Sequence, residues 1–180
     1  MLVEQARRLY EKGFAGDLSF DEYVASIPMI PDFPESYTAR FPELLLVDAR
    51  LSVQRQCELL GVDFSNESHS YVNADFYRAK TSKVYWIRAQ DGRVYKGKSA
   101  IACRTAFAED EVGLSVHEGL ALFAQNGDKL QGRGMDLPAS VRPEACEYVV
   151  FLSWFLARPL LSWSWGGYAV PHCGSASRGK

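Results

Sequence analysis

The sequence predicts a single α+β domain in which a small antiparallel sheet is packed by about three to five helices. Two β-prone runs flank Asp91-Gly92, and residues that begin and end helices recur on both sides of them. A chain of 180 residues, 47% of them apolar, can bury one large core. We therefore expect residues 43–180 to form an α+β core domain and residues 1–42 to form an arm that lies across it.

The arm is predicted to hold two short helices followed by an extended strap. Residues 2–12 have amphipathic spacing, and Ser19 with Glu22 forms the capping box that begins a second helix. The stretch IPMIPDFPESYTARFPE then places four prolines between residues 28 and 42. Because proline disfavours helix both at its own position and at the residue before it, we expect extended or turn backbone there.

Two core helices are predicted from the residues at their ends. Residues 52–60 begin at the N-cap Ser52 and end at Gly61, which suits the left-handed position after a helix. Residues 116–125 follow an S-x-x-E capping box, and we expect His117 in the first turn to be exposed.

The clearest strand signal is a hairpin predicted over residues 83–97. Asp91-Gly92 is a pair that type I′ turns prefer, and the runs on both sides are β-prone. One face of this hairpin, suited to a core, carries Tyr85, Ile87, Ala89 and Val94. The other face carries Trp86, Arg88, Arg93 and Tyr95. Aromatic rings interleaved with cations can stack a planar ligand or simply form a solvated sheet face.

Further segments complete the predicted fold. Residues 68–79 fit a strand, residues 128–140 a polar loop, and residues 143–157 a final helix that begins at Pro143 and is apolar nearly all round. The acidic run 109–111 is expected to lie in a solvated loop.

The last seven residues, GSASRGK (174–180), fit the G-x-x-x-x-G-K spacing of a phosphate loop. That loop works where it joins a buried strand to a helix and where Ser or Thr follows the lysine. Neither follows Lys180 here, and Pro171 is awkward in the strand that should precede the loop. We expect a frayed, weakly basic tail with no nucleotide bound to it.

Charge and apolar patterning disfavour several classes of function. The net charge of −2 arises from 20 basic and 22 acidic side chains without long runs of either sign, which disfavours a nucleic-acid partner. The charges in MLVEQARRLYEKGF do not fit a signal peptide, and the longest apolar stretch, residues 148–157, is too short to span a bilayer. We expect a cytoplasmic protein with no membrane partner, whose four widely spaced cysteines are reduced thiols.

The candidates for catalysis are Cys173, His172 and His117. Adjacent residues of an extended chain point in opposite directions, so His172 can act as a base for Cys173 only if a turn folds them together. His117-Glu118 resembles half of an H-E-x-x-H zinc site, but Ala121 stands where the second histidine belongs. We expect no metal and no cofactor, and a small cysteine- and histidine-dependent enzyme is the alternative function.

The segment WSWGGY (163–168) carries the leading hypothesis about function. In an extended chain Trp163 and Trp165 share one side, and the glycine pair lets a ligand or another backbone come close. With Tyr168 they either line an aromatic groove or close the core beneath the last helix. The ligand-binding candidates are Trp86, Arg88, Tyr95, Trp163, Trp165 and Tyr168. They predict a non-catalytic binding module for an unknown small molecule or protein; a structural subunit of a larger assembly is a third possibility.

Three stretches resemble a family of small bacterial proteins of unknown function: YWIRAQDGRVYKGKSA, LSVHEGLALFAQNGD and ARPLLSWSWGGYAVPHCGSASRG. The resemblance covers residues 42–180 and implies a bacterial cytosolic protein. It assigns no activity, so no site residue follows from it.

Overall fold

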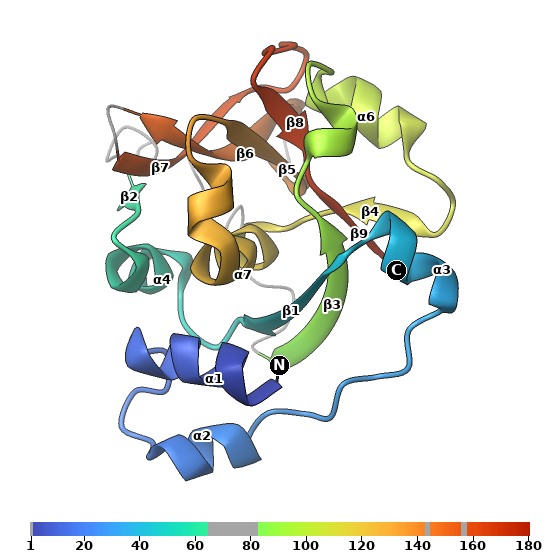
Figure 1. The fold of residues 1–180 in the computed structure, drawn as a ribbon. Helices are drawn as coiled ribbons and strands as arrows, with labels where there is room; N and C mark the ends of the chain where they lie inside the picture. Colours follow the sequence, from blue (N-terminus) through green and yellow to red (C-terminus); the bar gives the residue numbers. More distant parts are fainter. Residues whose placement is uncertain (1, 65–82, 143–144, 156–157) are drawn as a thin grey trace.

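The computed structural model describes residues 2–64, 83–142, 145–155 and 158–180, which form an α+β fold with a four-stranded and a five-stranded sheet (Figure 1). The described helices are α1 (Leu2–Glu11), α2 (Phe20–Ala25), α3 (Glu35–Arg40), α4 (Val53–Leu60), α6 (Ala100–Ala106) and α7 (Val116–Asn126), with the 3-10 helices η2 (Arg93–Tyr95) and η3 (Gly127–Leu130). The described strands are β1 (Glu43–Asp48), β2 (Asp63–Phe64), β3 (Val84–Gln90), β4 (Glu111–Gly113), β5 (Gly134–Arg142), β6 (Ala145–Phe155), β7 (Arg158–Trp165), β8 (Cys173–Ser175) and β9 (Ser177–Gly179). The strand predicted over residues 68–79 lies outside the described residues.

The helices predicted from their end residues are confirmed. Ser19 and Ser115 begin α2 and α7 with complete capping boxes, and Ser52 accepts a hydrogen bond from a main-chain amide in the first turn of α4. Gly61 follows α4 with φ +63°, a backbone conformation that glycine adopts without steric cost. Local sequence determines these ends because each cap is satisfied within three or four residues.

The predicted hairpin over residues 83–97 is wrong in its second half. The first run forms β3, which pairs antiparallel with β1 along its length, while the second run forms η2. Gly92 has φ +88°, and a Cβ on it would lie 2.4 Å from the Gly174 carbonyl oxygen. The Gly97 amide donates to the Cys173 carbonyl at 2.8 Å. The chain after Asp91 therefore turns toward the C-terminal strands instead of folding back on β3.

The final helix predicted over residues 143–157 is also wrong, because the described residues of that segment form β6. Tyr148, Val149, Val150 and Phe151 are aromatic or β-branched and favour strands. β6 buries Val149 on one face and Val150 and Leu152 on the other, so it lacks the polar alternation that marks a half-buried strand. The polar loop predicted over residues 128–140 is likewise wrong: its residues form the end of η3 and most of β5.

The two sheets are joined by the C-terminal strands. The first sheet has the order β1-β3-β9-β4 with antiparallel pairs, and the second has the order β2-β7-β6-β5-β8 with parallel pairs at β2–β7 and β5–β8. β8 thus belongs to one sheet and β9 to the other, although only Ala176 separates them. The expectation of a frayed tail is wrong, because long-range strand pairing fixes a segment that has no local signal.

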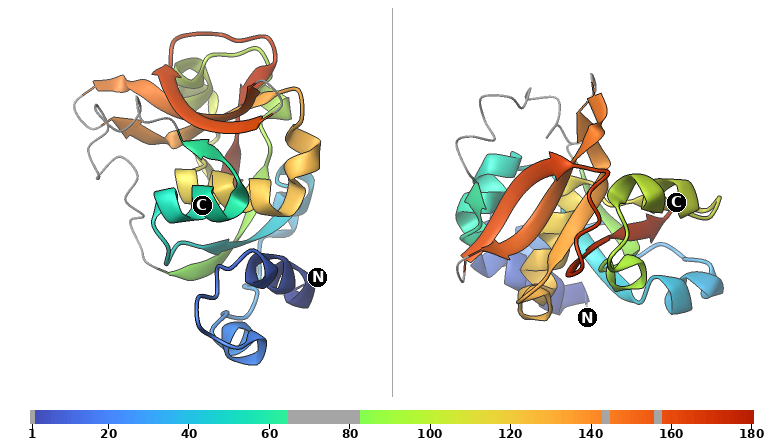
Figure 2. Two further views of the ribbon diagram at one scale, coloured as in Figure 1. Left: turned by 90° about the vertical axis from the view of Figure 1, so that its left-hand side faces the viewer. Right: turned by 90° about the horizontal axis from the view of Figure 1, so that it is seen from above.

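The core lies between the sheets, with α7 inside it (Figures 1 and 2). α7 contacts β1, β5, α1 and α4, and its Leu120 and Leu122 are completely buried. α1 packs against β1 and α7, so the arm shares this core. After α2 the chain runs as an extended strap to α3 (Figure 1). Among the described residues no helix is long and apolar enough to cross a membrane.

Candidate functional site

The structure separates the three residues considered for catalysis. Cys173 is buried beside Gly134 and Asp136, whereas its neighbour His172 is exposed. Burial raises the pKa of the Cys173 thiol to about 11, which disfavours a thiolate nucleophile at neutral pH. The geometry therefore does not support a Cys173–His172 pair.

His117 is buried, so the expectation that it would be exposed is wrong. The main chain of Leu51 hydrogen-bonds the imidazole. Burial lowers the pKa of His117. The charged groups near the His117 imidazole are the carboxylates of Asp48 and Glu118, and Cys173 is not among its neighbours.

The ligand-binding candidates from the former hairpin also lie apart from the C-terminal tryptophans. Trp86 is only 5% exposed because the strap covers it, and its indole Nε1–H donates to the Pro28 carbonyl at 2.9 Å. The Arg88 guanidinium lies 6.0 Å from the centre of the Phe33 ring, which is also on the strap. The Tyr95 hydroxyl lies 3.2 Å from the Glu111 carboxylate, and burial raises the pKa of Tyr95 to about 12. These three side chains hold the strap and η2 in place.

The C-terminal aromatic residues do come together. Trp163 and Trp165 project from the same face of β7, and their cross-strand partners on β6 are Val150 and Tyr148. Tyr148 packs edge to face on Trp163 with ring centres 5.1 Å apart. The second pair, Trp165 and Tyr168, is also edge to face, at 5.0 Å. We call these four side chains, Tyr148, Trp163, Trp165 and Tyr168, the aromatic surface.

A glycine turn holds the exposed end of the aromatic surface. Trp165 and Tyr168 are 40% and 64% exposed. The Tyr168 amide donates to the Trp165 carbonyl at 3.1 Å, and the Ile101 amide of α6 donates to the Gly166 carbonyl at 3.0 Å. A Cβ on Gly167 would lie 2.4 Å from the Trp165 ring, so this glycine permits the ring to fold over the turn. The main-chain hydrogen bonds thus fix the turn, and the edge-to-face contact sets the directions of the two exposed rings.

The polar atoms of the aromatic surface have no partners in the described part of the chain. Neither indole N–H of Trp163 and Trp165, nor the hydroxyl of Tyr148 or Tyr168, makes a hydrogen bond to a described residue. Of the buried aromatic donors, those of Trp86 and Tyr23 have hydrogen-bond partners, whereas the Trp154 indole N–H has none among the described residues. The aromatic surface therefore offers ring faces together with four donor groups that no described residue engages.

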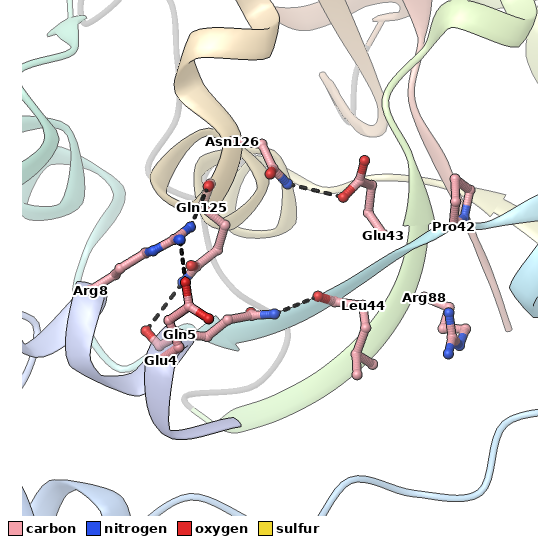
Figure 3. A pocket seen from close by; sticks show the side chains of 9 residues that line it. All are labelled: Glu4, Gln5, Arg8, Pro42, Glu43, Leu44, Arg88, Gln125 and Asn126. Carbon is pink, nitrogen blue, oxygen red and sulfur yellow. Dashed lines mark hydrogen bonds and ion pairs between the residues drawn. The ribbon is translucent and has the colours of Figure 1, made fainter. Parts of the chain in front are cut away.

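A polar cavity of about 260 Å³ lies between α1, β1 and the end of α7 (Figure 3). The Gln5 amide donates to the Leu44 carbonyl at 2.7 Å and accepts from the Leu46 amide at 2.8 Å. Arg8 donates to Glu4 at 2.5 Å and to the Gln125 carbonyl at 2.9 Å. Gln5 and Arg8 thus attach the arm to β1 and α7, whereas the Oε1 atom of Gln125, which also lines the cavity, is buried without a partner among the described residues.

Two acidic residues, Asp136 and Glu111, are buried, although the local sequence does not predict it. Asp136 on β5 is 8% exposed, its carboxyl makes no hydrogen bond or ion pair with a described residue, and burial raises its pKa to about 6. Its parallel neighbour Ser175 has a buried hydroxyl without a partner among the described residues. Glu111 was expected in a solvated loop but is buried, where it accepts hydrogen bonds from Tyr95 and Ser177. Long-range pairing of β5 with β8 and of β4 with β9, together with the position of η2, brings these neighbours together.

The described residues contain no group of three or more histidine, cysteine or acidic side chains arranged to hold a metal ion. Comparisons of the chain with protein-family models, with curated proteins and with solved structures found no match.

Proposed function

We propose that the protein is a binding module whose partner docks on the aromatic surface. One observation carries the proposal: Trp165 and Tyr168 are exposed and held in fixed directions, and the indole and hydroxyl donors of all four rings are free of hydrogen bonds to described residues. Tryptophan and tyrosine dominate the energetic centres of protein interfaces because they combine large apolar area with a polar end.

The energetics favour a partner over water at this surface. Each large aromatic side chain can bury on the order of 150–250 Å² on contact, and apolar burial contributes about 25 cal/mol per Å². Because the turn that carries Tyr168 is already fixed by hydrogen bonds to Trp165 and α6, little conformational entropy is lost on docking. A small, preorganised aromatic surface of this kind suits an extended peptide segment better than a deeply enclosed metabolite.

The experiment is a selection of displayed random peptides against the folded protein, followed by affinity measurements on Trp165→Ala. We expect selected peptides to lose about ten-fold or more in affinity, since the variant removes an exposed interface aromatic. Val94→Ala is the matched control, because Val94 is an exposed apolar side chain on η2. Selected peptides that bind Trp165→Ala as tightly as the unchanged protein would overturn the proposal.

A further inference from the structure

The strap between α2 and α3 has a proline at every third position. Pro28, Pro31 and Pro34 occur in the run PMIPDFP, and all three are exposed. A polyproline II helix has three residues per turn, so this spacing places the three rings on one side of such a helix. We call these three exposed prolines the proline ridge.

Proline biases the backbone of the strap toward this conformation. The three rings fix φ near −65°, and the residues before them, Ile27, Ile30 and Phe33, are pushed toward extended or polyproline II angles. Pro34 has φ −52° and ψ 138°. Residues 28–34 form no helix, strand or turn. Little conformational freedom remains to be lost when a partner binds the ridge.

The opposite side of the strap is anchored to the body of the protein. Ile27 and Phe33 pack against the core, and the Pro28 carbonyl accepts the Trp86 indole hydrogen bond. Met29 beside the ridge is 88% exposed. One side of the strap is thus buried, while the proline ridge and Met29 face solvent.

The proline ridge and the aromatic surface have complementary chemistry, and we propose that the aromatic surface of one copy binds the proline ridge of a second copy. Polyproline II backbone has no internal hydrogen bonds, and proline offers no N–H. The Pro28 and Pro34 carbonyls accept from Trp86 and Tyr37, whereas no described residue donates to the carbonyls of residues 29–33, which remain as acceptors for a partner. The aromatic surface offers the indole and hydroxyl donors that such carbonyls need, with ring faces against which proline rings pack. This inference rests on the proposed function and names its partner.

The two surfaces of one chain cannot meet. The strap runs below α1 and beside α3, whereas β7 and the glycine turn lie at the other end of the molecule in both side views (Figures 1 and 2). Trp86 and the core hold the strap there. Two copies related by a two-fold axis can exchange the contact reciprocally, which gives two equivalent docking sites and a closed dimer.

The test is sedimentation velocity of the full chain over a range of concentrations, from about 10 µM to about 1 mM, where weak protein contacts are populated. We expect concentration-dependent dimerisation that falls at least ten-fold in Pro31→Ala and in Trp165→Ala. The matched controls are Pro42→Ala, an exposed proline outside the ridge, and Val94→Ala. Neither control is expected to change dimerisation.

A mixing experiment separates this contact from any other dimer. Pro31→Ala keeps its aromatic surface and Trp165→Ala keeps its proline ridge, so an equimolar mixture regains one of the two contacts. We expect the mixture to associate more strongly than either variant alone. A chain that stays monomeric at the highest concentration, or a mixture no better than its components, overturns the inference. If displayed peptides still bind in a Trp165-dependent way, the proposed function stands without it; if no peptide does, both fail.

Discussion

The cavity beside α1 and the aromatic surface are opposites in how their polar groups are satisfied. Around the cavity, Gln5 and Arg8 each bind two partners and hold the arm to the body, and among the described residues the Oε1 atom of Gln125 is the buried exception without a partner. On the aromatic surface, four donors have no partner among the described residues. Polar groups that hydrogen-bond to one another stabilise the fold. Exposed aromatic rings whose donors have no partner among the described residues can instead contact a ligand. The residues around the cavity therefore attach the arm to the core, and the aromatic surface is the stronger candidate for a binding site.

The largest expected effect lies outside both regions, where β8 packs against the main chain at Gly92. A Cβ on Gly174 would lie 2.1 Å from the Gly92 carbonyl oxygen, a main-chain atom that cannot move aside easily. We expect Gly174→Ala to lower the free energy of unfolding by about 3 kcal/mol or more, measured by urea denaturation. Gly127→Ala is the control, because its Cβ would meet only ordinary contacts with Phe123. Equal stability of the two variants would contradict this close packing.

A pH-dependent effect is expected at Asp136. Its pKa is about 6 in the folded protein against 3.8 for an aspartate exposed to water, so the folded state holds the proton more tightly than the unfolded state. Stability must then fall as the pH rises from 4 to 6, by at most about 3 kcal/mol from this group. We expect Asp136→Asn to become progressively more stable than the unchanged protein over that interval, measured by thermal unfolding.

The matched control for Asp136 is Asp110→Asn. Arg40 lowers the pKa of Asp110, so this carboxylate contributes stability at neutral pH that is lost as the pH falls. The two difference curves must therefore have opposite signs at neutral pH. A flat curve for Asp136→Asn would show that the carboxyl finds a partner or water.

The direct contrast between the two regions is Gln5→Ala against Tyr168→Ala. Gln5→Ala removes two hydrogen bonds to β1, so we expect it to lower the free energy of unfolding by about 1–2 kcal/mol and to leave peptide binding unchanged. Tyr168→Ala removes an exposed ring, so we expect a change in unfolding of less than about 0.5 kcal/mol and weaker peptide binding. The reverse pattern would exchange the roles assigned to the two regions.

The sequence predicted what depends on near neighbours. Ser19, Ser52 and Ser115 bind amides within their own first turns, so the helix ends could be recognised correctly. The alternation of Trp163 and Trp165 likewise predicted a shared face, which the register of β6 and β7 confirms. Such signals involve residues close together in the chain.

The errors arose where distant strands decide the local structure. β6 was mistaken for a helix because residues on both of its faces are buried and its sequence is mostly apolar. The pairing of β9 with β3 and β4 has no signal in the local sequence Ser177-Arg178-Gly179. Asp136 and Glu111 could not be recognised as buried for the same reason. Trp86 and Arg88 were grouped correctly on one face of β3, but no local pattern shows that the strap covers that face.

The placement of β9 has a consequence for how the protein is made. β9 lies between β3 and β4, yet residues 177–179 are synthesised after both of its neighbours. During translation, β3 and β4 each have an unpaired edge. The segment that pairs with both edges lies more than 60 residues further along the chain. Closure of this sheet is therefore a late, long-range step of folding, and the nascent chain is most exposed to edge-to-edge aggregation just before GSASRGK emerges.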